Sequence, residues 1–107
     1  MTHLYTLLLG GTVLAPSAEE PVCEAIAWAE GTILAFGSEA DVRALSRGDS
    51  HVLRADGSFV VGDAGPLEIG GPADLIVYRS DPRQGHPGSP AARVRAGRIV
   101  EGHLARE

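Results

Sequence analysis

Short apolar runs recur along the chain, and each is bounded by glycine, proline, aspartate or serine. Runs of about four to eight residues between such breakers are typical of β-strands. The pattern therefore predicts an all-β fold, a β-sandwich of about seven to nine short strands. The runs behind this prediction are residues 4–9, 12–14, 25–29, 32–36, 51–54, 58–61, 67–69, 75–78, 92–95 and 98–100.

Glycine-containing pairs between these runs predict the turns. The pairs at 30–31, 56–57 and 96–97 each offer a glycine for the positive φ that a tight hairpin turn needs, although residues 55–57 also allow a bulged version. The glycine pairs at 10–11 and 70–71 are interpreted as turns as well. Neither has the spacing of a phosphate-binding loop or opens a helix.

The turn at residues 30–31 predicts a hairpin that is apolar on both faces. A hairpin with one face in water alternates apolar with polar residues, so both faces of this one should be covered. The predicted cross-strand pairs are Trp28 with Ile33 and Ile26 with Ala35 on one face, and Ala27 with Leu34 and Ala25 with Phe36 on the other.

One segment, about residues 38–46, predicts a short α-helix. Ser38 is a good N-cap, and Asp41 follows it by three residues. Val42 and Leu45 share one helical face. The helix is the single exception to the β pattern.

The chain is predicted to be one composite domain with a seam in the middle. Residues 62–66 are a cluster of breakers without periodicity, and residues 80–90, with three prolines and two glycines, predict an irregular loop. The tail from residue 101 is polar and expected to fray. The predicted organisation is a domain over residues 1–107, with an N-terminal half at 1–61, the seam at 62–66 and a C-terminal half at 67–107.

The order of these segments resembles the small composite β-sandwich domain of the metal-dependent amidohydrolase superfamily, as in imidazolonepropionase-like enzymes and deaminases. In that family the domain is assembled from both ends of the chain around a catalytic barrel. The matching segments are Leu7-Leu8-Leu9-Gly10-Gly11-Thr12-Val13, residues 26–38, Asp56-Gly57-Ser58-Phe59-Val60-Val61, Gly65-Pro66-Leu67-Glu68-Ile69-Gly70-Gly71-Pro72-Ala73-Asp74-Leu75 and Val94-Arg95-Ala96-Gly97-Arg98-Ile99-Val100.

The departure from the family lies at the seam. The resemblance implies that the strand at residues 59–61 should lead to a His-x-His pair of metal ligands, but the chain reads Gly62-Asp63-Ala64-Gly65. It contains no His-x-His and no lysine, and a (β/α)₈ barrel needs about 250 residues. The expected chain is a sandwich that lacks the catalytic barrel.

The amino-acid composition argues against two classes of binding partner, nucleic acids and membranes. The formal net charge is −5, and all nine basic residues are scattered arginines, so nucleic acid is not an expected partner. The apolar run at residues 7–9 ends at the glycine pair and is too short for a signal peptide or a membrane span. No membrane partner is expected, and a cytoplasmic location is the default.

The side chains that could carry chemistry are few and dispersed. The single cysteine, Cys23, allows no internal disulfide and is interpreted as a buried spectator thiol rather than a nucleophile. Asp74 is interpreted as a turn-stabilising residue. We predict no catalytic, cofactor-binding or metal-ligating residue and no cofactor. The alternative of a metal site would have to use His3, His51, His86 and His103, which show no short-spaced pair.

Three functions remain open. In the first, the chain is a stand-alone, non-catalytic remnant of an amidohydrolase that acts in assembly or binding. The face of Ala25, Ala27, Leu34 and Phe36, uncovered without a barrel, would meet a homodimer partner or another protein. In the second, the chain completes a separate barrel subunit of a hydrolase for carbon–nitrogen bonds outside peptides. In the third, it binds a small ligand in a pocket at one end of the sandwich.

Overall fold

The computed structural model describes residues 5–14, 23–45, 50–63, 65–85 and 88–106. The predicted all-β class with one short α-helix is confirmed, and the described residues contain nine strands. The elements are β1 (Thr6–Val13), β2 (Cys23–Ala29), β3 (Thr32–Gly37), α1 (Glu39–Arg43), β4 (His51–Arg54), β5 (Phe59–Gly62), β6 (Leu75–Tyr78), the 3₁₀ turn η1 (Pro82–Gln84), β7 (Ala92–Arg95), β8 (Arg98–Gly102) and β9 (Ala105–Arg106).

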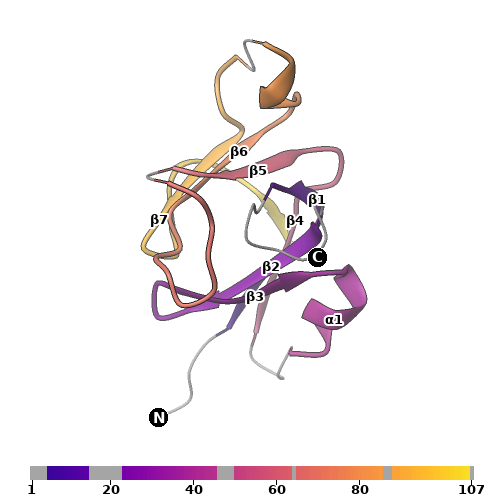
Figure 1. The fold of residues 1–107 in the computed structure, drawn as a ribbon, viewed down its shortest axis with the longest axis vertical. Helices are drawn as coiled ribbons and strands as arrows, with labels where there is room; N and C mark the ends of the chain where they lie inside the picture. Colours follow the sequence, from indigo (N-terminus) through magenta and orange to yellow (C-terminus); the bar gives the residue numbers. More distant parts are fainter. Residues whose placement is uncertain (1–4, 15–22, 46–49, 64, 86–87, 107) are drawn as a thin grey trace.

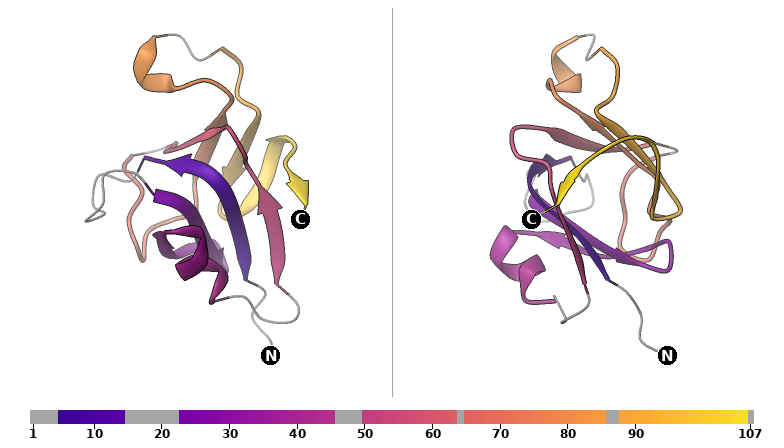
Figure 2. Two further views of the ribbon diagram at one scale, coloured as in Figure 1. Left: turned by 90° about the vertical axis from the view of Figure 1, so that its right-hand side faces the viewer. Right: turned by 180° about the vertical axis from the view of Figure 1, so that it is seen from behind.

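The strands form one continuous hydrogen-bonded network whose two parts face each other across the core (Figure 1). Its order is β3-β2-β1-β5-β6-β7-β8, with β4 paired to β1 and β9 paired to β4. Strand β1 belongs to both parts, because residues 6–9 pair in parallel with β4 and residues 12–13 pair in parallel with β5. Figure 2 shows this strand as a long curve beside β4.

The bend in β1 falls on the glycine pair, where a turn between two strands was predicted. That prediction is wrong, since β1 continues through both glycines with a register shift between Leu9 and Val13. Gly10 has φ +81°, which bends the strand without reversing it. An added Cβ on Gly11 would lie 3.2 Å from the Cβ of Ala55, so glycine allows the chain at residue 55 to approach closely.

The turns at residues 30–31 and 96–97 form the predicted hairpins. Glu30 and Gly31 have φ values of 53° and 76°, and Ala96 and Gly97 have 50° and 78°. Positive φ at both central residues is the tight turn that matches strand twist. The predicted hairpin at residues 56–57 is wrong, because β4 and β5 both run parallel to β1 and do not pair with each other.

The register predicted for the β2–β3 hairpin is confirmed only near its turn. Trp28 lies opposite Ile33 as predicted, but Leu34 is an extra residue in β3. This bulge shifts every later pair by one, so Ala27 lies opposite Ala35 and Ile26 lies opposite Phe36. Periodicity alone does not reveal such an insertion.

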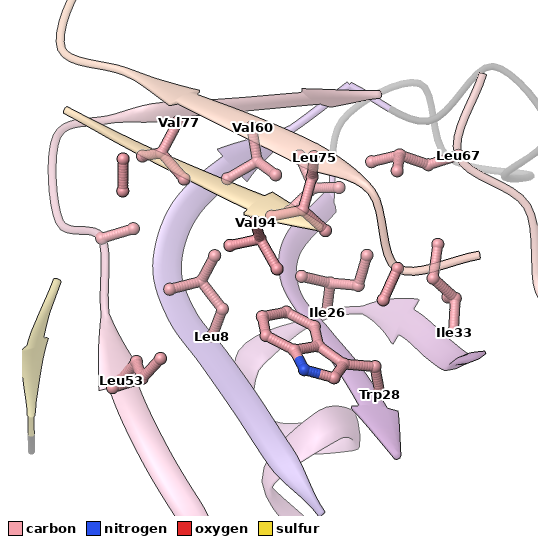
Figure 3. Close-up of a cluster of buried hydrophobic side chains, with 14 of the residues drawn as sticks. Leu8, Ile26, Trp28, Ile33, Leu53, Val60, Leu67, Leu75, Val77 and Val94 are labelled. Atoms are coloured by element: carbon pink, nitrogen blue, oxygen red, sulfur yellow. The ribbon is translucent and has the colours of Figure 1, made fainter. Parts of the chain in front are cut away.

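Two groups of buried side chains lie on opposite faces of β1 and β2. The main core fills the space between the two parts of the sheet (Figure 3), and its larger members are Leu8, Ile26, Trp28, Ile33, Leu53, Val60, Leu67, Leu75, Val77 and Val94. The second group is Leu7, Leu9, Ala25, Ala27 and Val42.

Helix α1 provides Val42 to the second group and lies beside β2 and β3, on the side away from β5–β7 (Figure 1). Its predicted cap is confirmed: the Asp41 amide donates to the Ser38 hydroxyl at 3.1 Å. The expectation that this face is uncovered is wrong for Ala25 and Ala27, which are fully buried within the chain. Phe36 packs against the main core, and Leu34 remains 36% exposed.

The two halves of the chain join directly at the seam. β5 and β6 are antiparallel neighbours with Gly62 opposite Leu75, and the Asp63 amide donates to the Asp74 carbonyl at 3.0 Å. A Cβ on Gly62 would overlap the Gly65 carbonyl oxygen. Leu67 is buried in the main core, so the segment anchors itself without forming the strand expected at residues 67–69.

The C-terminal segment is more ordered than its polarity suggested. β8 extends to Gly102, and β9 pairs with β4, with Leu53 opposite Arg106 and Arg54 opposite Ala105. The prediction of a frayed tail from residue 101 is therefore wrong for residues 101–106. The loop predicted at 80–90 is irregular as expected over its described residues, apart from η1.

Candidate functional site

A groove lies at one end of the main core, where the sheet opens to solvent. Its floor begins with a row of three residues on adjacent strands, because Thr6 of β1 lies opposite both Trp28 of β2 and His51 of β4. Leu53, two residues after His51, lies on the same side of its strand. Trp28 and Leu53 both lie on the lower side of the cluster in Figure 3.

Two further segments enclose the groove. The β7–β8 hairpin contributes Gly97, Arg98 and Ile99 as one wall, and the C-terminal segment contributes Leu104 and Arg106 as the other. The groove is open to solvent and has a volume of about 410 Å³. A small-molecule site typically measures about 300 to 1,000 Å³, so the groove has the size of such a site.

The contact between Trp28 and Gly97 fixes the floor against the hairpin wall. The indole Nε1 donates to the Gly97 carbonyl at 3.0 Å. An added Cβ on Gly97 would lie 2.9 Å from the Trp28 Cδ1, and Gly97 has φ +78°. Glycine is therefore required there both by the backbone conformation and by the close approach of the ring.

The segment before β6 holds the two hairpin turns together. The Ala73 amide donates to the Gly31 carbonyl at 2.8 Å, and the Gly97 amide donates to the Ala73 carbonyl at 3.0 Å. The Asp74 Oδ1 accepts from the Ala96 amide at 2.7 Å. Asp74 thus has a structural role of the expected kind, but it stabilises a turn 22 residues away rather than its own.

The rim of the groove carries two arginine side chains, those of Arg98 and Arg106. Five of the described arginines form ion pairs elsewhere: Arg43, Arg54, Arg83, Arg93 and Arg95. The structure gives neither Arg98 nor Arg106 an ion pair with any described residue, and both line the groove beside His51. The only acidic side chain nearby among the lining residues is Glu30, in an adjoining hollow that shares Arg98 and Trp28 with the groove.

The shifted pKa values of the described residues lie outside this groove. The hydrogen bonds from Arg54 lower the pKa of Asp56 below its ordinary value, and those from Arg83 do the same for the pKa of Asp81. The Arg54–Asp56 pair sits over the bend at Gly10, where a Cβ would collide with it. These ion pairs stabilise local turns and do not belong to the groove.

The residues considered in the sequence are dispersed in the structure. Cys23 is buried in the main core, and Asp74 lies at the hairpin turns. His51 lines the groove, His103 is exposed after β8, and His3 and His86 lie outside the described residues. Among the described residues, no three histidine, cysteine, aspartate or glutamate side chains are grouped to hold a metal ion.

The sequence allowed a pocket at one end of the sandwich as an alternative but did not identify its residues. The lining comes from residues 6 to 106, and no motif in the sequence connects them. Within the described ranges, no helix has the length and apolar character to cross a bilayer.

The comparisons with known proteins give one partial likeness. No protein-family model and no curated protein matches the chain. A crystal structure of an enamidase, described as a member of the amidohydrolase superfamily, is 26% identical with a TM-score of 0.43. The match covers 54% of this chain and 15% of the enamidase chain, so the present chain spans a small part of that enzyme's length. At this TM-score the likeness defines neither fold nor function here.

Proposed function

We propose that the chain is a non-catalytic β-sandwich module that binds a small molecule in the groove. The observation that carries this proposal is the groove's construction: a mainly apolar floor under a basic rim, with a lining drawn from five strands and a hairpin turn. Backbone hydrogen bonds from Ala73 hold both hairpin turns in place. A site that is formed before the ligand arrives avoids the entropy cost of ordering it.

The proposal of a remnant without its own chemistry has separate support. The order of the sequence motifs resembles an amidohydrolase-type sandwich, and residues 62–67 join its two halves where that family inserts its barrel. The two side chains with the best claim to chemistry have structural surroundings, since Cys23 is in the main core and Asp74 bonds a turn. Binding is then the activity that the remaining surface supports.

The test uses Trp28, the single tryptophan of the chain, as a reporter inside the groove. A metabolite panel is screened with the full chain for compounds that both raise the melting temperature and change the Trp28 emission. A ligand at about 100 times its Kd stabilises the native state by about 2.7 kcal/mol. We expect at least one compound to give both signals.

Two neighbouring residues of β8 supply the matched variants. Ile99 lines the groove, whereas Val100 is 58% exposed and lies outside its lining. We expect Ile99→Asn to weaken the binding of any such compound and Val100→Asn to leave it unchanged. A panel in which no compound gives both signals, or a compound that binds both variants as well as the wild type, would overturn the proposal.

A second candidate, assembly into a homodimer, is favoured by the position of β8. This strand ends the sheet, all five of its residues are exposed, and its outer edge pairs with no other described strand. Two copies could pair these edges antiparallel about a two-fold axis, with Val100 against its counterpart. Sedimentation equilibrium should then show a concentration-dependent dimer that Val100→Lys abolishes. A monomer at every concentration would exclude this candidate.

A further inference from the structure

We infer that the groove selects a ligand with an anionic group on an apolar body, such as an aryl or branched-chain carboxylate. The inference rests on the proposed function and adds the chemical class of the ligand. Two features of the lining carry it: the arginines on the rim and the apolar character of the floor.

The arginines form a cationic end in a chain that is otherwise acidic. With a net charge of −5, carboxylates are in excess, and five other described arginines are paired with them. Arg98 and Arg106 approach the groove from different strands and have no such partner among the described residues. A guanidinium forms two parallel hydrogen bonds with a carboxylate or a sulfonate, so an anion is the complementary group.

The floor is mainly apolar, and its hydrogen-bonding side chains are those of Thr6 and His51 in addition to Trp28. Trp28 has one polar atom in its side chain, and that atom already donates to the Gly97 carbonyl. Leu53, Ile99 and Leu104 are apolar, and Ile99 is 40% exposed. An apolar ligand body would cover this surface, which is the favourable change on binding.

Glu30 gives the ligand a direction. It lies in the adjoining hollow, next to Arg98, whereas Arg106 and His51 line only the groove proper. An anion is attracted to the Arg106 side, where no described lining residue is acidic. The charged group of the ligand therefore lies toward β4 and β9, and its apolar body lies over Trp28.

The test compares two dyes that share one aromatic body. 1-Anilinonaphthalene-8-sulfonate carries an anionic group, and N-phenyl-1-naphthylamine is the same molecule without it. Energy transfer from Trp28 reports dye bound to the chain, and the part of the signal lost in Ile99→Asn reports dye bound in the groove. We expect the sulfonate to bind about tenfold more tightly, because each exposed arginine contributes a factor of about two to five.

Variants that remove the arginine charges distinguish the contribution of the ligand's anionic group to binding from that of its apolar body. Arg98→Gln with Arg106→Gln should weaken the sulfonate about tenfold and leave the neutral dye unchanged. Arg79→Gln is the matched control, since Arg79 is the other described arginine without an ion pair and lies outside the groove. Circular dichroism and melting temperature establish that each variant is folded.

The outcomes distinguish this inference from the proposed function. Equal binding of the two dyes, unaffected by the double variant, would overturn the anionic preference and leave a groove that binds apolar molecules. An absence of energy transfer from Trp28 with both dyes would overturn the proposed function as well. Competition by 4-phenylbutyrate, but not by 4-phenyl-1-butanol, would extend the preference from sulfonate to carboxylate.

Discussion

The two tight hairpins of the molecule have the same local design and very different surroundings. Both turns have positive φ at the two central residues, and in both hairpins the second strand contains one extra residue. Yet six of the seven residues of β2 are buried, whereas all five residues of β8 are exposed. Turn chemistry thus sets the shape of a hairpin, while distant parts of the chain decide how much of it is covered.

Two segments cover the β2–β3 hairpin, here called the inner hairpin, and the β7–β8 hairpin is called the outer one. α1 packs over the Ala25 and Ala27 side of β2. The segment before β6 bonds the edge of β3, because the Ile33 amide donates to the Gly71 carbonyl at 2.9 Å and the Gly70 amide donates to the Ile33 carbonyl at 2.8 Å. No described segment does this for the outer edge of β8, the last strand in the order.

The largest effect on the free energy of unfolding is expected for a buried apolar residue of the β2–β3 hairpin, compared with an exposed one of the β7–β8 hairpin. Ile26→Ala should lower the free energy of unfolding by about 2–5 kcal/mol, since Ile26 is fully buried between the two parts of the sheet. Val100→Ala on β8 should change it by less than about 0.5 kcal/mol. Urea denaturation measures both, and similar losses would show that β8 is buried in an assembly.

The next effect concerns the turn of the outer hairpin. Gly97→Ala should cost about 2–3 kcal/mol, because the new methyl group meets both an unfavourable positive φ and the Trp28 ring. Gly57→Ala is the control: it has φ +74° and no atom within 4 Å of the added Cβ, so only the backbone term of about 1–2 kcal/mol applies. Equal losses, with unchanged Trp28 emission, would contradict the close contact.

A smaller effect tests the cover over the inner hairpin. Ser38→Ala should lower the free energy of unfolding by about 1 kcal/mol, because the Asp41 amide loses its acceptor at the start of α1. Ser38→Asp should restore the stability, since aspartate is an equally good N-cap. Hydrogen exchange at the Asp41 amide should accelerate in the alanine variant alone; unchanged exchange there would count against the cap.

The smallest effect involves the exposed loop that precedes β7. Arg83 lowers the pKa of Asp81 in the folded state, so the pair adds stability above the ordinary aspartate pKa of about 3.9. That stability is lost as pH falls through the lowered pKa. In Arg83→Gln, carboxyl titration by NMR should show the Asp81 pKa returning toward its ordinary value. No movement would mean that the pair is absent in solution.

Local signals in the sequence were sufficient for much of the fold. Gly31 and Gly97 marked their turns, and Ser38 marked the start of the helix, because these residues act on their own backbone. The errors arose where a distant strand decides the outcome. The glycine pair in β1 bends a strand instead of ending it, and Asp56-Gly57 links two strands whose partner is β1 rather than each other.

The groove could not be predicted for the same reason. Thr6, Trp28 and His51 lie side by side through strand pairing, although up to 45 positions separate them in the sequence. The prediction that the apolar face of β2 is uncovered was wrong, because Val42 of helix α1 packs against that face. Sequence patterns identify which faces are apolar, but not which segment reaches them.

The pairing of β5 with β6 constrains both ends of the segment that links them. Gly62 and Leu75 lie opposite each other, so strand pairing holds the two attachment points about 5 Å apart, whatever is placed between them. Closing a longer loop adds only about 0.6 kcal/mol for each doubling of its length. A longer segment between Gly62 and Leu75 would therefore leave the two strands paired.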